Sequence, residues 1–366
     1  MMKLSTEREA LLKPLQAVIG VVERRQTMPI LANVLLSARD GTLSITATDL
    51  EVELVASIKL SIDQEGEVTV PGRKLLDICR ALPEGANVSL LQSGEKVQVR
   101  SGRSRFSLTT LPAAEFPTVE DVAADRTVDV PQSTFLKLIE KTHFSMAQQD
   151  VRYYLNGLLM ETGGNHFRAV ATDGHRLALS QAELPDAGLP EKQVIVPRKG
   201  VLELQRLLSG DGDVKIALGS NHIRINLEGI RFTSKLIDGR FPEYDRVIPK
   251  DPGNVLSADR QVLKGALQRT AILSNEKYRG IRLMLKGGTL VLQAHNPEQE
   301  EAEEEVEVEY TGEDMEIGFN VNYLQDALGA IEGDNVSLAF VDANSSCLMT
   351  EPGNEETRYV VMPMRL

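Results

Sequence analysis

Apolar residues along the chain alternate between two spacings. A helical spacing of three and four residues recurs six times, in windows that begin near residues 7, 72, 133, 197, 260 and 320. Between these windows apolar and polar residues alternate strictly, as in 52–58, 214–218 and 306–310, which is the pattern of half-buried β-strands. Short loops between such strands favour antiparallel pairing. The sequence therefore predicts an α+β fold, with helix pairs packed on antiparallel sheets.

One unit of sequence occurs three times. VPGRKLLDICRALPEG matches VPRKGVLELQRLLSGD, and GFNVNYLQDALGAIEGD is a weaker copy. Leu111, Leu236 and Val361 occupy equivalent places at steps of 125 residues. A long-period repeat indicates repeated structural units. We therefore predict three domains of one fold, each with two helices, at residues 1–125, 126–251 and 252–366.

The net charge of the chain is −13, which argues against a protein that coats nucleic acid by general attraction. The charge is uneven, because the windows 5–26, 72–84, 132–153, 197–211 and 259–279 together carry about +7 and leave about −20 for the rest. The sixth window, 320–334, is acidic. If the basic helices share one side of the molecule, that side attracts phosphate groups. Ordinary solvated helix faces are the alternative explanation.

Candidate phosphate contacts lie in or beside the basic windows. They are Arg25, Arg73, Gln149, Arg152, Tyr153, Tyr154, Arg198 and Lys199. The window 132–153 places Gln149 and the tyrosines at the end of a helix, where adjacent rings could stack on an exposed base. Core packing is an equal alternative for at least one tyrosine. No helix-turn-helix, zinc-finger or RNA-binding signature accompanies these residues, so we expect no base-sequence readout.

Two motifs suggest catalysis only weakly. ATDGHRL places Asp173 beside His175, and SNEK formally fits the Ser-x-x-Lys nucleophile pattern, but both lack the further motifs that their chemistry requires. The other two copies carry Asp-Leu-Glu and Asn-Pro-Glu in place of Asp-Gly-His, so a turn at a strand end explains the motif better. The five histidines show no metal-ligand spacing, and no loop fits a nucleotide. We expect no enzyme, no metal and no cofactor.

The sequence also bears on the compartment. No apolar run approaches the ~20 residues of a membrane span, and the segment MMKLSTEREALLK lacks the apolar core of a signal peptide. Cys79 and Cys347 each lie inside an apolar pattern, which indicates buried thiols rather than a disulfide. We therefore expect a cytoplasmic protein with no membrane partner.

Segments along the whole chain resemble one known family. SGRSRFSL, FSMAQQDVRYYLNG, ATDGHRLA, VIVPRKG, FTSKLIDGRFPEY, AILSNEKYRG, NPEQEEAEE, EIGFNV and YVVMPMRL are similar to segments of the β subunit of bacterial DNA polymerase III, the sliding clamp family. The resemblance implies a head-to-tail homodimer, in which six domains form a ring with helices around the hole. It implies that the ring encircles double-stranded DNA in replication and gives the polymerase its processivity. The implied protein partners are the polymerase III catalytic subunit, the clamp loader complex, and other polymerases and repair proteins that carry a clamp-binding motif.

The resemblance also implies that two unlike surfaces pair in the dimer. The first surface consists of Lys74, Arg103, Arg105, Phe106 and Leu108, and the second of Ile272, Leu273, Glu298, Glu300, Glu301, Glu303 and Glu304. Burial of the four apolar side chains should carry most of the affinity, while the charges set register and encounter rate. An acidic run taken by itself is usually just solvated.

A further site is indicated by the tail MPMRL, which is apolar where most termini are polar. Flexible methionines suit a surface that accepts several different peptides. The resemblance places a partner-peptide pocket between the second and third domains, formed by Leu155, Thr172, Gly174, His175, Arg176, Leu177, Pro242, Arg246, Val247, Asn320, Tyr323, Ser346, Val360, Val361, Met362, Pro363, Met364, Arg365 and Leu366. Core packing is the alternative for the valines.

One alternative function belongs to a different class. A scaffold built from repeats could bind peptides without ever encircling DNA. The two functions differ in their dependence on the dimer, since a scaffold should keep its function as a monomer. Because the sequence contains no nucleotide-binding loop, a ring of this chain would have to be opened by another protein.

Overall fold

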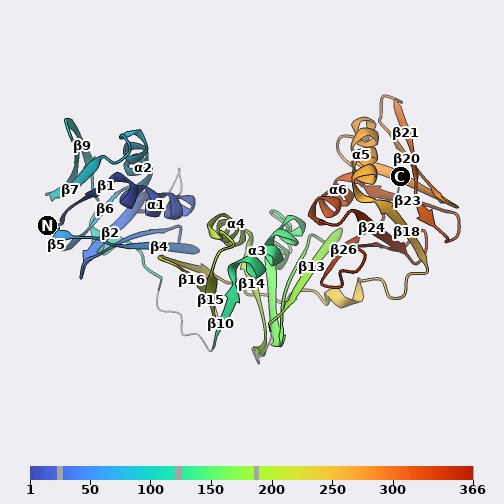
Figure 1. The fold of residues 1–366 in the computed structure, drawn as a ribbon, viewed down its shortest axis with the longest axis horizontal. Coiled ribbons are helices and arrows are strands. Elements are labelled where there is room, and N and C mark those ends of the chain that lie inside the picture. The colour runs from blue at the N-terminus through green and yellow to red at the C-terminus, as the bar shows by residue number, and fades with distance from the viewer. Residues whose placement is uncertain (23–27, 120–125, 185–188, 366) are drawn as a thin grey trace. The chain divides into compact units, whose positions relative to one another are not determined.

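The computed structural model describes residues 1–22, 28–119, 126–184 and 189–365. Within these ranges the chain forms six α-helices and four β-sheets (Figure 1). It divides into two compact units, Met1–Ser133 with Leu202–Leu236 (unit 1) and Thr134–Val201 with Ile237–Leu366 (unit 2). Both units combine helices with antiparallel strands, which confirms the predicted α+β class.

One helix lies in each of the six predicted windows. The helices are α1 (Arg8–Val18), α2 (Gly72–Ala81), α3 (Gln132–Glu140), α4 (Arg198–Leu207), α5 (Arg260–Thr270) and α6 (Val321–Ala330). Together these six segments carry a formal charge of +7, so the remainder of the chain carries −20. The positive charge is therefore concentrated on the helices themselves, with α5 contributing +3 and α6 contributing −1.

The helix predicted over 132–153 is much shorter than expected. It ends at Glu140, and 3₁₀ turns at His143–Ser145 and Tyr153–Leu155 follow. The Thr142 hydroxyl donates to the carbonyl of Leu138 at 2.6 Å, which satisfies a last-turn acceptor from the side chain. Gln149 has a φ of 56°, which a right-handed helix does not permit. Gln149 and the tyrosines therefore lie in a loop and a turn, and the prediction that they end a helix was wrong.

Unit 1 contains two sheets. The five-stranded sheet has the order β5-β1-β7-β8-β9, formed by β1 (Lys3–Glu7), β5 (Ile62–Gln64), β7 (Asn87–Ser93), β8 (Lys96–Ser101) and β9 (Ser104–Thr109). The eight-stranded sheet has the order β10-β15-β16-β17-β4-β3-β2-β6, formed by β2 (Asn33–Arg39), β3 (Thr42–Thr48), β4 (Val52–Lys59), β6 (Gly66–Pro71), β10 (Arg126–Pro131), β15 (Asp213–Leu218), β16 (His222–Leu227) and β17 (Ile230–Lys235). Pairing of β17 with β4 joins strands from two sequence copies into one sheet.

Unit 2 repeats this arrangement. Its nine-stranded sheet has the order β14-β11-β12-β13-β26-β25-β24-β18-β22, formed by β11 (Gly157–Gly164), β12 (His166–Thr172), β13 (Arg176–Glu183), β14 (Leu189–Pro197), β18 (Asn254–Asp259), β22 (Glu309–Tyr310), β24 (Asn335–Phe340), β25 (Cys347–Thr350) and β26 (Thr357–Val361). Its four-stranded sheet has the order β21-β20-β19-β23, formed by β19 (Gly280–Lys286), β20 (Thr289–His295), β21 (Glu301–Glu307) and β23 (Met315–Asn320). Pairing of β13 with β26 joins the second copy to the third.

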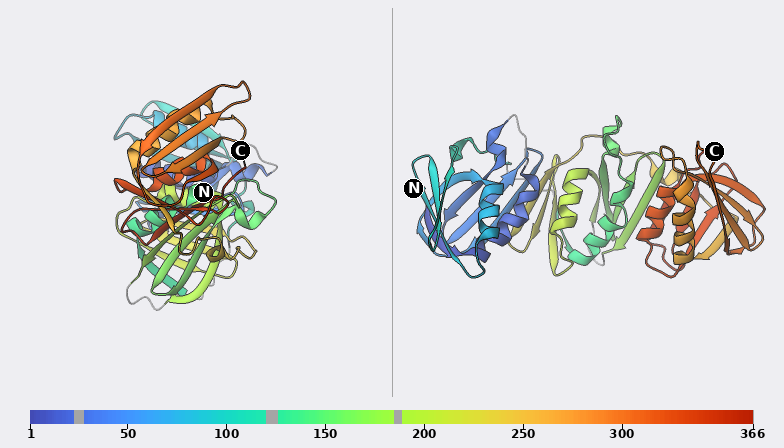
Figure 2. Two further views of the ribbon diagram at one scale, coloured as in Figure 1. Left: turned by 90° about the vertical axis from the view of Figure 1, so that its right-hand side faces the viewer. Right: turned by 90° about the horizontal axis from the view of Figure 1, so that it is seen from above.

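The largest core of unit 2 lies between its two sheets, where α5 and α6 run side by side (Figure 2). Leu263 and Leu267 of α5 and Leu324 and Leu328 of α6 are fully buried there, together with apolar residues of both sheets. The apolar stripe that predicted each helix is therefore the face that enters the core. Burying four leucines contributes roughly 6 to 12 kcal/mol before the cost of ordering the chain.

The register of the first two sequence copies corresponds to a shared turn. The Asp49 carboxylate accepts from the backbone N–H groups of Glu51 and Val52, at 2.9 and 2.7 Å. The Asp173 carboxylate accepts from His175 and Arg176 in the same way, at 2.9 and 3.0 Å. These bonds are typical of Asx turns. The interpretation of Asp-Gly-His as a turn at a strand end is confirmed.

Replacing Gly157 with alanine should destabilise the protein by about 2 kcal/mol, because the added Cβ overpacks a filled site. That Cβ would lie 2.5 Å from the backbone oxygen of Val196 and 2.9 Å from the Ile195 side chain. Gly253 is the matched control, since a Cβ there would meet nothing within 4 Å. Urea unfolding should show a lower midpoint for Gly157→Ala than for Gly253→Ala. Equal midpoints would contradict the close contact.

Candidate functional site

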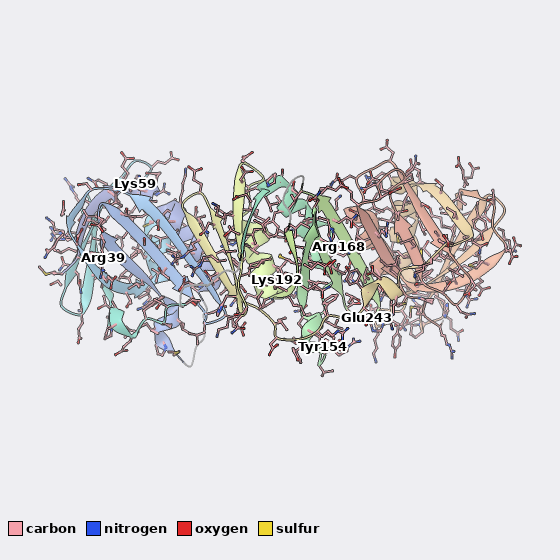
Figure 3. The ribbon with its side chains drawn as sticks, turned by 90° about the horizontal axis from the view of Figure 1, so that it is seen from below. Arg39, Lys59, Tyr154, Arg168, Lys192 and Glu243 are labelled. Carbon is pink, nitrogen blue, oxygen red and sulfur yellow. The ribbon has the colours of Figure 1, made fainter. Side chains whose placement is uncertain are left out.

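A pocket of about 190 Å³ lies in unit 2, where β12 and β13 meet β26 and the turn Tyr244–Arg246. It is lined by Arg152, Tyr154, Leu155, Thr172, Gly174, Arg176, Leu177, Pro242, Glu243, Tyr244, Val247, Val360 and Met362. Leu177 and Val360 belong to a small apolar core, which makes the pocket floor hydrophobic. Charged groups stand at the rim, and Figure 3 shows Tyr154 and Glu243 on the same side of the unit. Such a site fits one apolar side chain of an extended ligand.

The structure places about half of the predicted pocket residues at this cavity. They are Leu155, Thr172, Gly174, Arg176, Leu177, Pro242, Val247, Val360 and Met362. Sequence reasoning missed Glu243 and Tyr244, although they lie between two residues that it named, Pro242 and Arg246. It predicted that Arg152 and Tyr154 contact phosphate groups, whereas both line this cavity.

Several other predicted pocket residues do not line the pocket but contact residues that do. The backbone oxygen of His175 accepts from Met362, Arg246 pairs with Glu243, and the hydroxyl of Ser346 donates to the Val247 carbonyl. The remaining ones lie elsewhere in unit 2. Asn320 caps α6, Val361 is buried in β26, Tyr323 packs against Arg176, Pro363 follows β26, and Met364 and Arg365 line another hollow. Leu366 lies outside the described residues.

Arg176 links the pocket to α6. Its Nε donates to Asp173 at 3.1 Å, its Nη1 lies 2.5 Å from the carboxylate of Asp326, and its Nη2 donates to the Phe144 carbonyl at 2.6 Å. The guanidinium also stacks on the Tyr323 ring, 4.5 Å from its centroid. These contacts hold the Arg176 side chain in place at the edge of the pocket. Through Asp326 and Tyr323 they also connect the pocket to α6 of the third sequence copy.

A second rim residue, Arg152, is held by its own loop. Its Nε and Nη2 donate to the two carboxylate oxygens of Asp150, at 3.0 and 2.8 Å, and Nη2 also donates to the Asp173 carbonyl. The guanidinium lies so close to Gly174 that a Cβ there would be 2.7 Å from it. Gly174 has a φ of 87°, so glycine is needed at this turn for conformation as well as for space.

The Asp150 carboxylate should stay ionised well below pH 4. Hydrogen bonds from the Arg152 side chain and backbone lower its pKa to about 2. Since the pKa is lowered in the folded chain, the pair's contribution is present above the ordinary aspartate value and is lost as the pH falls toward 2. A ¹³C NMR titration should find no Asp150 midpoint between pH 7 and about 3, since the midpoint lies near pH 2. Arg152→Met should return the midpoint to ~3.9, and an unchanged midpoint in that variant would contradict the assignment.

The other candidate phosphate contacts are distributed over both units. Arg73 on α2 donates to the Val22 carbonyl at 2.7 Å, and Arg198 at the start of α4 donates to the Met146 carbonyl at 3.3 Å. Lys199 lies beside Arg198 and is half-buried. Gln149 and Tyr153 are exposed, and the rings of Tyr153 and Tyr154 meet edge to face. Arg25 lies outside the described residues.

The first predicted dimer surface occupies the end of the five-stranded sheet. β9 is the last strand of this sheet and bonds to β8. Arg103, Arg105 and Lys74 are exposed, and Phe106 is 37% exposed. Leu108 is only 7% exposed within one chain, so its burial in a dimer has little left to contribute.

The second predicted dimer surface occupies the end of the four-stranded sheet. β21 is its last strand and bonds to β20. Ile272 in the turn Ala271–Leu273 is 75% exposed, and Leu273 is half-buried. Glu298, Glu300, Glu301 and Glu303 are exposed. Glu304 differs from them because it is half-buried and accepts from Arg269 of α5, with the Nε bond at 3.1 Å.

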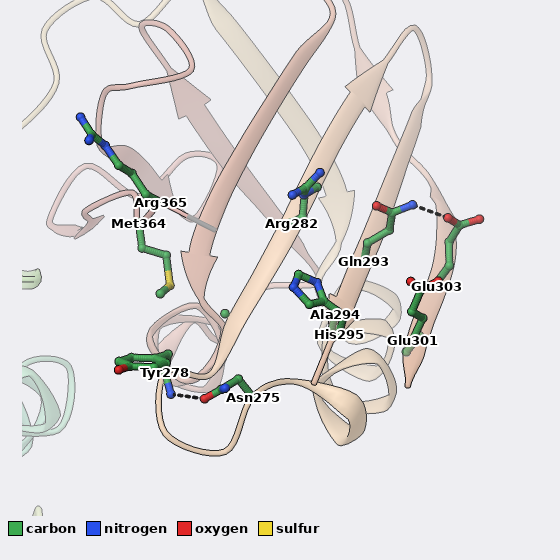
Figure 4. Close-up of a pocket in the computed structure, with 12 residues that line it drawn as sticks. Asn275, Tyr278, Arg282, Gln293, Ala294, His295, Glu301, Glu303, Met364 and Arg365 are labelled. Carbon is green, nitrogen blue, oxygen red and sulfur yellow. Dashed lines mark hydrogen bonds between the residues drawn. The ribbon is translucent and has the colours of Figure 1, made fainter. Parts of the chain in front are cut away.

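A larger hollow of about 620 Å³ lies on one face of the four-stranded sheet. Figure 4 shows Tyr278 and Met364 on one side of this hollow and Glu301 and Glu303 on the other. The Met364 backbone N–H donates to the Gly318 carbonyl at 2.8 Å, which fixes the tail against β23. Met364 and Arg365 therefore border this hollow and do not line the apolar pocket.

Models of three domains of the DNA polymerase III beta subunit match the chain, the N-terminal domain at residues 2–120, the central domain at 129–243 and the C-terminal domain at 245–365. The chain belongs to the DNA polymerase III beta subunit family. In this beta subunit the pocket is lined from two domains, because Leu177 falls in the match to the central domain and Val360 in the match to the C-terminal domain.

Relatives and solved structures of the beta subunit cover the whole chain. The beta sliding clamps of Pseudomonas putida and Escherichia coli K12 are 56% and 54% identical to it over the full length of both chains. The crystal structure of the DNA polymerase III subunit beta from Pseudomonas aeruginosa matches with a TM-score of 0.98 at 54% identity, covering both chains completely. A sliding clamp of Pseudomonas aeruginosa bound to griselimycin matches with a TM-score of 0.97 at 55% identity, again over both whole chains.

Two further features bear on chemistry and location. Among the residues that the structure describes, no group of three or more His, Cys, Asp and Glu side chains could hold a metal ion. Over the same residues, no helix has the length and apolar content needed to cross a membrane. Cys79 and Cys347 are free and buried, as their apolar surroundings predict, and burial raises the pKa of the Cys79 thiol to about 11.

Proposed function

We propose that this chain is a replicative sliding clamp, in which two copies join head to tail into a ring that encircles double-stranded DNA. The observation that carries the proposal is a pair of unlike sheet edges. β9 ends one sheet with basic residues, and β21 ends another with acidic residues. Edge strands offer unpaired backbone groups, and their opposite charges favour pairing between copies. Because the two edges differ, such a contact is head-to-tail and closes into a ring at the right rotation.

The proposed dimer contact combines apolar burial with charge. Ile272, Leu273 and Phe106 supply apolar surface, and the largest share, roughly 1 to 2 kcal/mol, comes from Ile272 because the other two are already partly buried in the single chain. Lys74, Arg103 and Arg105 face Glu298, Glu300, Glu301, Glu303 and Glu304 in the proposed pairing. These charges chiefly set register and encounter rate. Glu304 also holds Arg269 within its own chain, so it contributes less to the contact than its neighbours.

The DNA-facing surface in this proposal consists of the helices and the segment 149–154. The helices carry +7 in a chain whose remainder carries −20, so phosphate is attracted to them and repelled elsewhere. Arg25, Arg73, Gln149, Arg152, Tyr153, Tyr154, Arg198 and Lys199 are the proposed DNA contacts. A closed ring holds DNA by topology, so weak phosphate contacts without base readout suffice and permit sliding.

The proposed protein partners use the apolar pocket. A relative with 55% identity was solved with griselimycin, which supports a ligand site in this family. We propose that the polymerase III catalytic subunit, the clamp loader and repair proteins insert a short linear motif there. The chain itself supplies no catalysis and works in the cytoplasm, and the loader opens the ring. Three clamp domains at 1–125, 126–251 and 252–366 remain our proposed division.

Retention on DNA tests the ring. After treatment with the clamp loader and ATP, the chain should stay on covalently closed circular DNA and leave the same DNA once a restriction enzyme has linearised it, because only topology holds it. Equal retention on both forms would reject encirclement and favour the peptide-binding scaffold. Omitting the loader is the control, and it should abolish retention on both forms.

A further inference from the structure

One wall of the apolar pocket is tied to charged residues of the neighbouring strands. The Tyr244 side chain lines the pocket and is 5% exposed. Nη1 of Arg168 donates to its hydroxyl at 2.7 Å, and the hydroxyl donates to Oε1 of Glu161 at 3.1 Å. Arg168 belongs to β12 and Glu161 to β11, so the bonds tie the ring to two paired strands of the nine-stranded sheet. Figure 3 labels Arg168 within the sheet.

Tyr244 needs such an anchor because its backbone has little regular structure. It begins the 3₁₀ turn Tyr244–Arg246, and residues 236–243 before it belong to neither a helix nor a strand. A buried ring in such a segment is positioned by packing and by side-chain bonds. Phe241 and Tyr244 pack in the same apolar core as Leu177 and Val360. Packing alone leaves an aromatic ring freedom to shift, whereas the two hydroxyl bonds fix its outer end.

The anchor is itself rigid. Arg168 donates to Oε1 of Gln181 from Nε and Nη2, at 3.1 and 2.9 Å, and pairs with Glu161 at 2.9 Å. Gln193 donates to the other oxygen of Glu161 at 2.6 Å. Every charged group in the network has a partner on a neighbouring strand, so the hydroxyl meets a preorganised acceptor and donor. Burial raises the pKa of Tyr244 to about 12, which keeps the hydroxyl a donor at neutral pH.

We infer that Arg168 and Glu161 are positioning residues for the pocket, acting through the Tyr244 hydroxyl to hold its ring as a preformed wall. This inference rests on the proposed peptide-binding function of the same pocket. A preformed wall raises affinity because the ligand does not have to order it. The specificity of the pocket for an apolar side chain is then set partly by residues that the ligand never touches.

A double-mutant cycle on the full-length chain tests the inference, with griselimycin as the probe and calorimetry as the measurement. Tyr244→Phe keeps the ring and removes the hydroxyl, whereas Arg168→Met removes the guanidinium. Each should weaken binding about three- to tenfold, and the double variant should lose no more than the larger single loss, because Arg168 acts on the pocket only through the Tyr244 hydroxyl. Arg168→Lys retains a donor and should recover most of the affinity.

Arg231→Met is the matched control. Arg231 on β17 also pairs with a glutamate of a neighbouring strand, Glu53 at 3.7 Å, but it does not line this pocket. It should leave griselimycin binding unchanged. Unchanged binding by Tyr244→Phe, or losses that add in the double variant, would overturn the positioning role. If the unaltered chain fails to bind griselimycin, the proposed pocket function itself is wrong and the inference falls with it.

Discussion

Replacing Ile272 and Leu273 together with alanine should convert the protein from a dimer to a monomer of 40.2 kDa at micromolar concentration. Ile272 is 75% exposed in the single chain, beside the edge strand β21, so its burial gain is available to a second copy. Because Leu273 is already half-buried in the single chain, truncating the two side chains removes roughly 2 to 3 kcal/mol, which corresponds to about a thirty- to 150-fold rise in the dimer dissociation constant. Sedimentation velocity measures the shift directly.

Val341→Ala is the control for the dimer variant. Val341 is another exposed apolar residue of the same unit, but it belongs to neither predicted dimer surface. It should leave the dimer intact. The Ile272 and Leu273 variant should also lose retention on closed circular DNA, whereas a peptide-binding scaffold would keep its function as a monomer. A double variant that sediments as a dimer would refute the proposed contact.

Arg176→Ala should cause the second large loss, in both stability and ligand binding. The side chain is 13% exposed and bonds to Asp173, Asp326 and the Phe144 carbonyl, so its removal takes a charged partner from the largely buried Asp173 carboxylate and from the half-exposed Asp326. Breaking such a pair costs roughly 3 kcal/mol, at the lower end because Asp326 is about half exposed. The Tyr323 ring also loses its stacked guanidinium. Griselimycin binding should fall at least tenfold, since Arg176 is part of the pocket wall.

Arg39→Ala separates this effect from the loss of an ordinary ion pair. Arg39 and Glu67 form an exposed pair at 3.2 Å, which is worth ~0.5 kcal/mol. Urea unfolding followed by circular dichroism should lower the midpoint clearly for Arg176→Ala and barely for Arg39→Ala. Arg176→Lys should be intermediate, because an ammonium cannot fork between two carboxylates. Equal midpoints for the two alanine variants would contradict the linking role of Arg176.

The local pattern of apolar and polar residues by itself determined much of this fold. The apolar stripes located all six helices, because a stripe at helical spacing has to face a core. The alternating segments located the strands, and the repeat of 125 residues indicated three units of one fold. The charge imbalance also holds, since the five helices in the basic windows carry +8 and the helix in the acidic window carries −1. The acid at each strand end was identified as a turn residue, because its copies keep no catalytic pair.

Tertiary structure decided how those elements join and what lines the pocket. Pairing of β17 with β4 and of β13 with β26 joins strands that are far apart in the chain, and no spacing in the sequence encodes it. Arg152 was predicted as a phosphate contact, and Arg176 was placed at the pocket only through the family resemblance, yet their partners Asp150, Asp173 and Asp326 hold both of them at the pocket. A cation's role depends on which groups surround it. Asp150 and Asp173 are near neighbours of these arginines in the chain, but the Asp173 carbonyl that meets Arg152 and the Asp326 carboxylate that meets Arg176 are brought there only by the fold. The sequence identified many of the residues that form the pocket, and the contacts made in the folded chain determined what each of them does there.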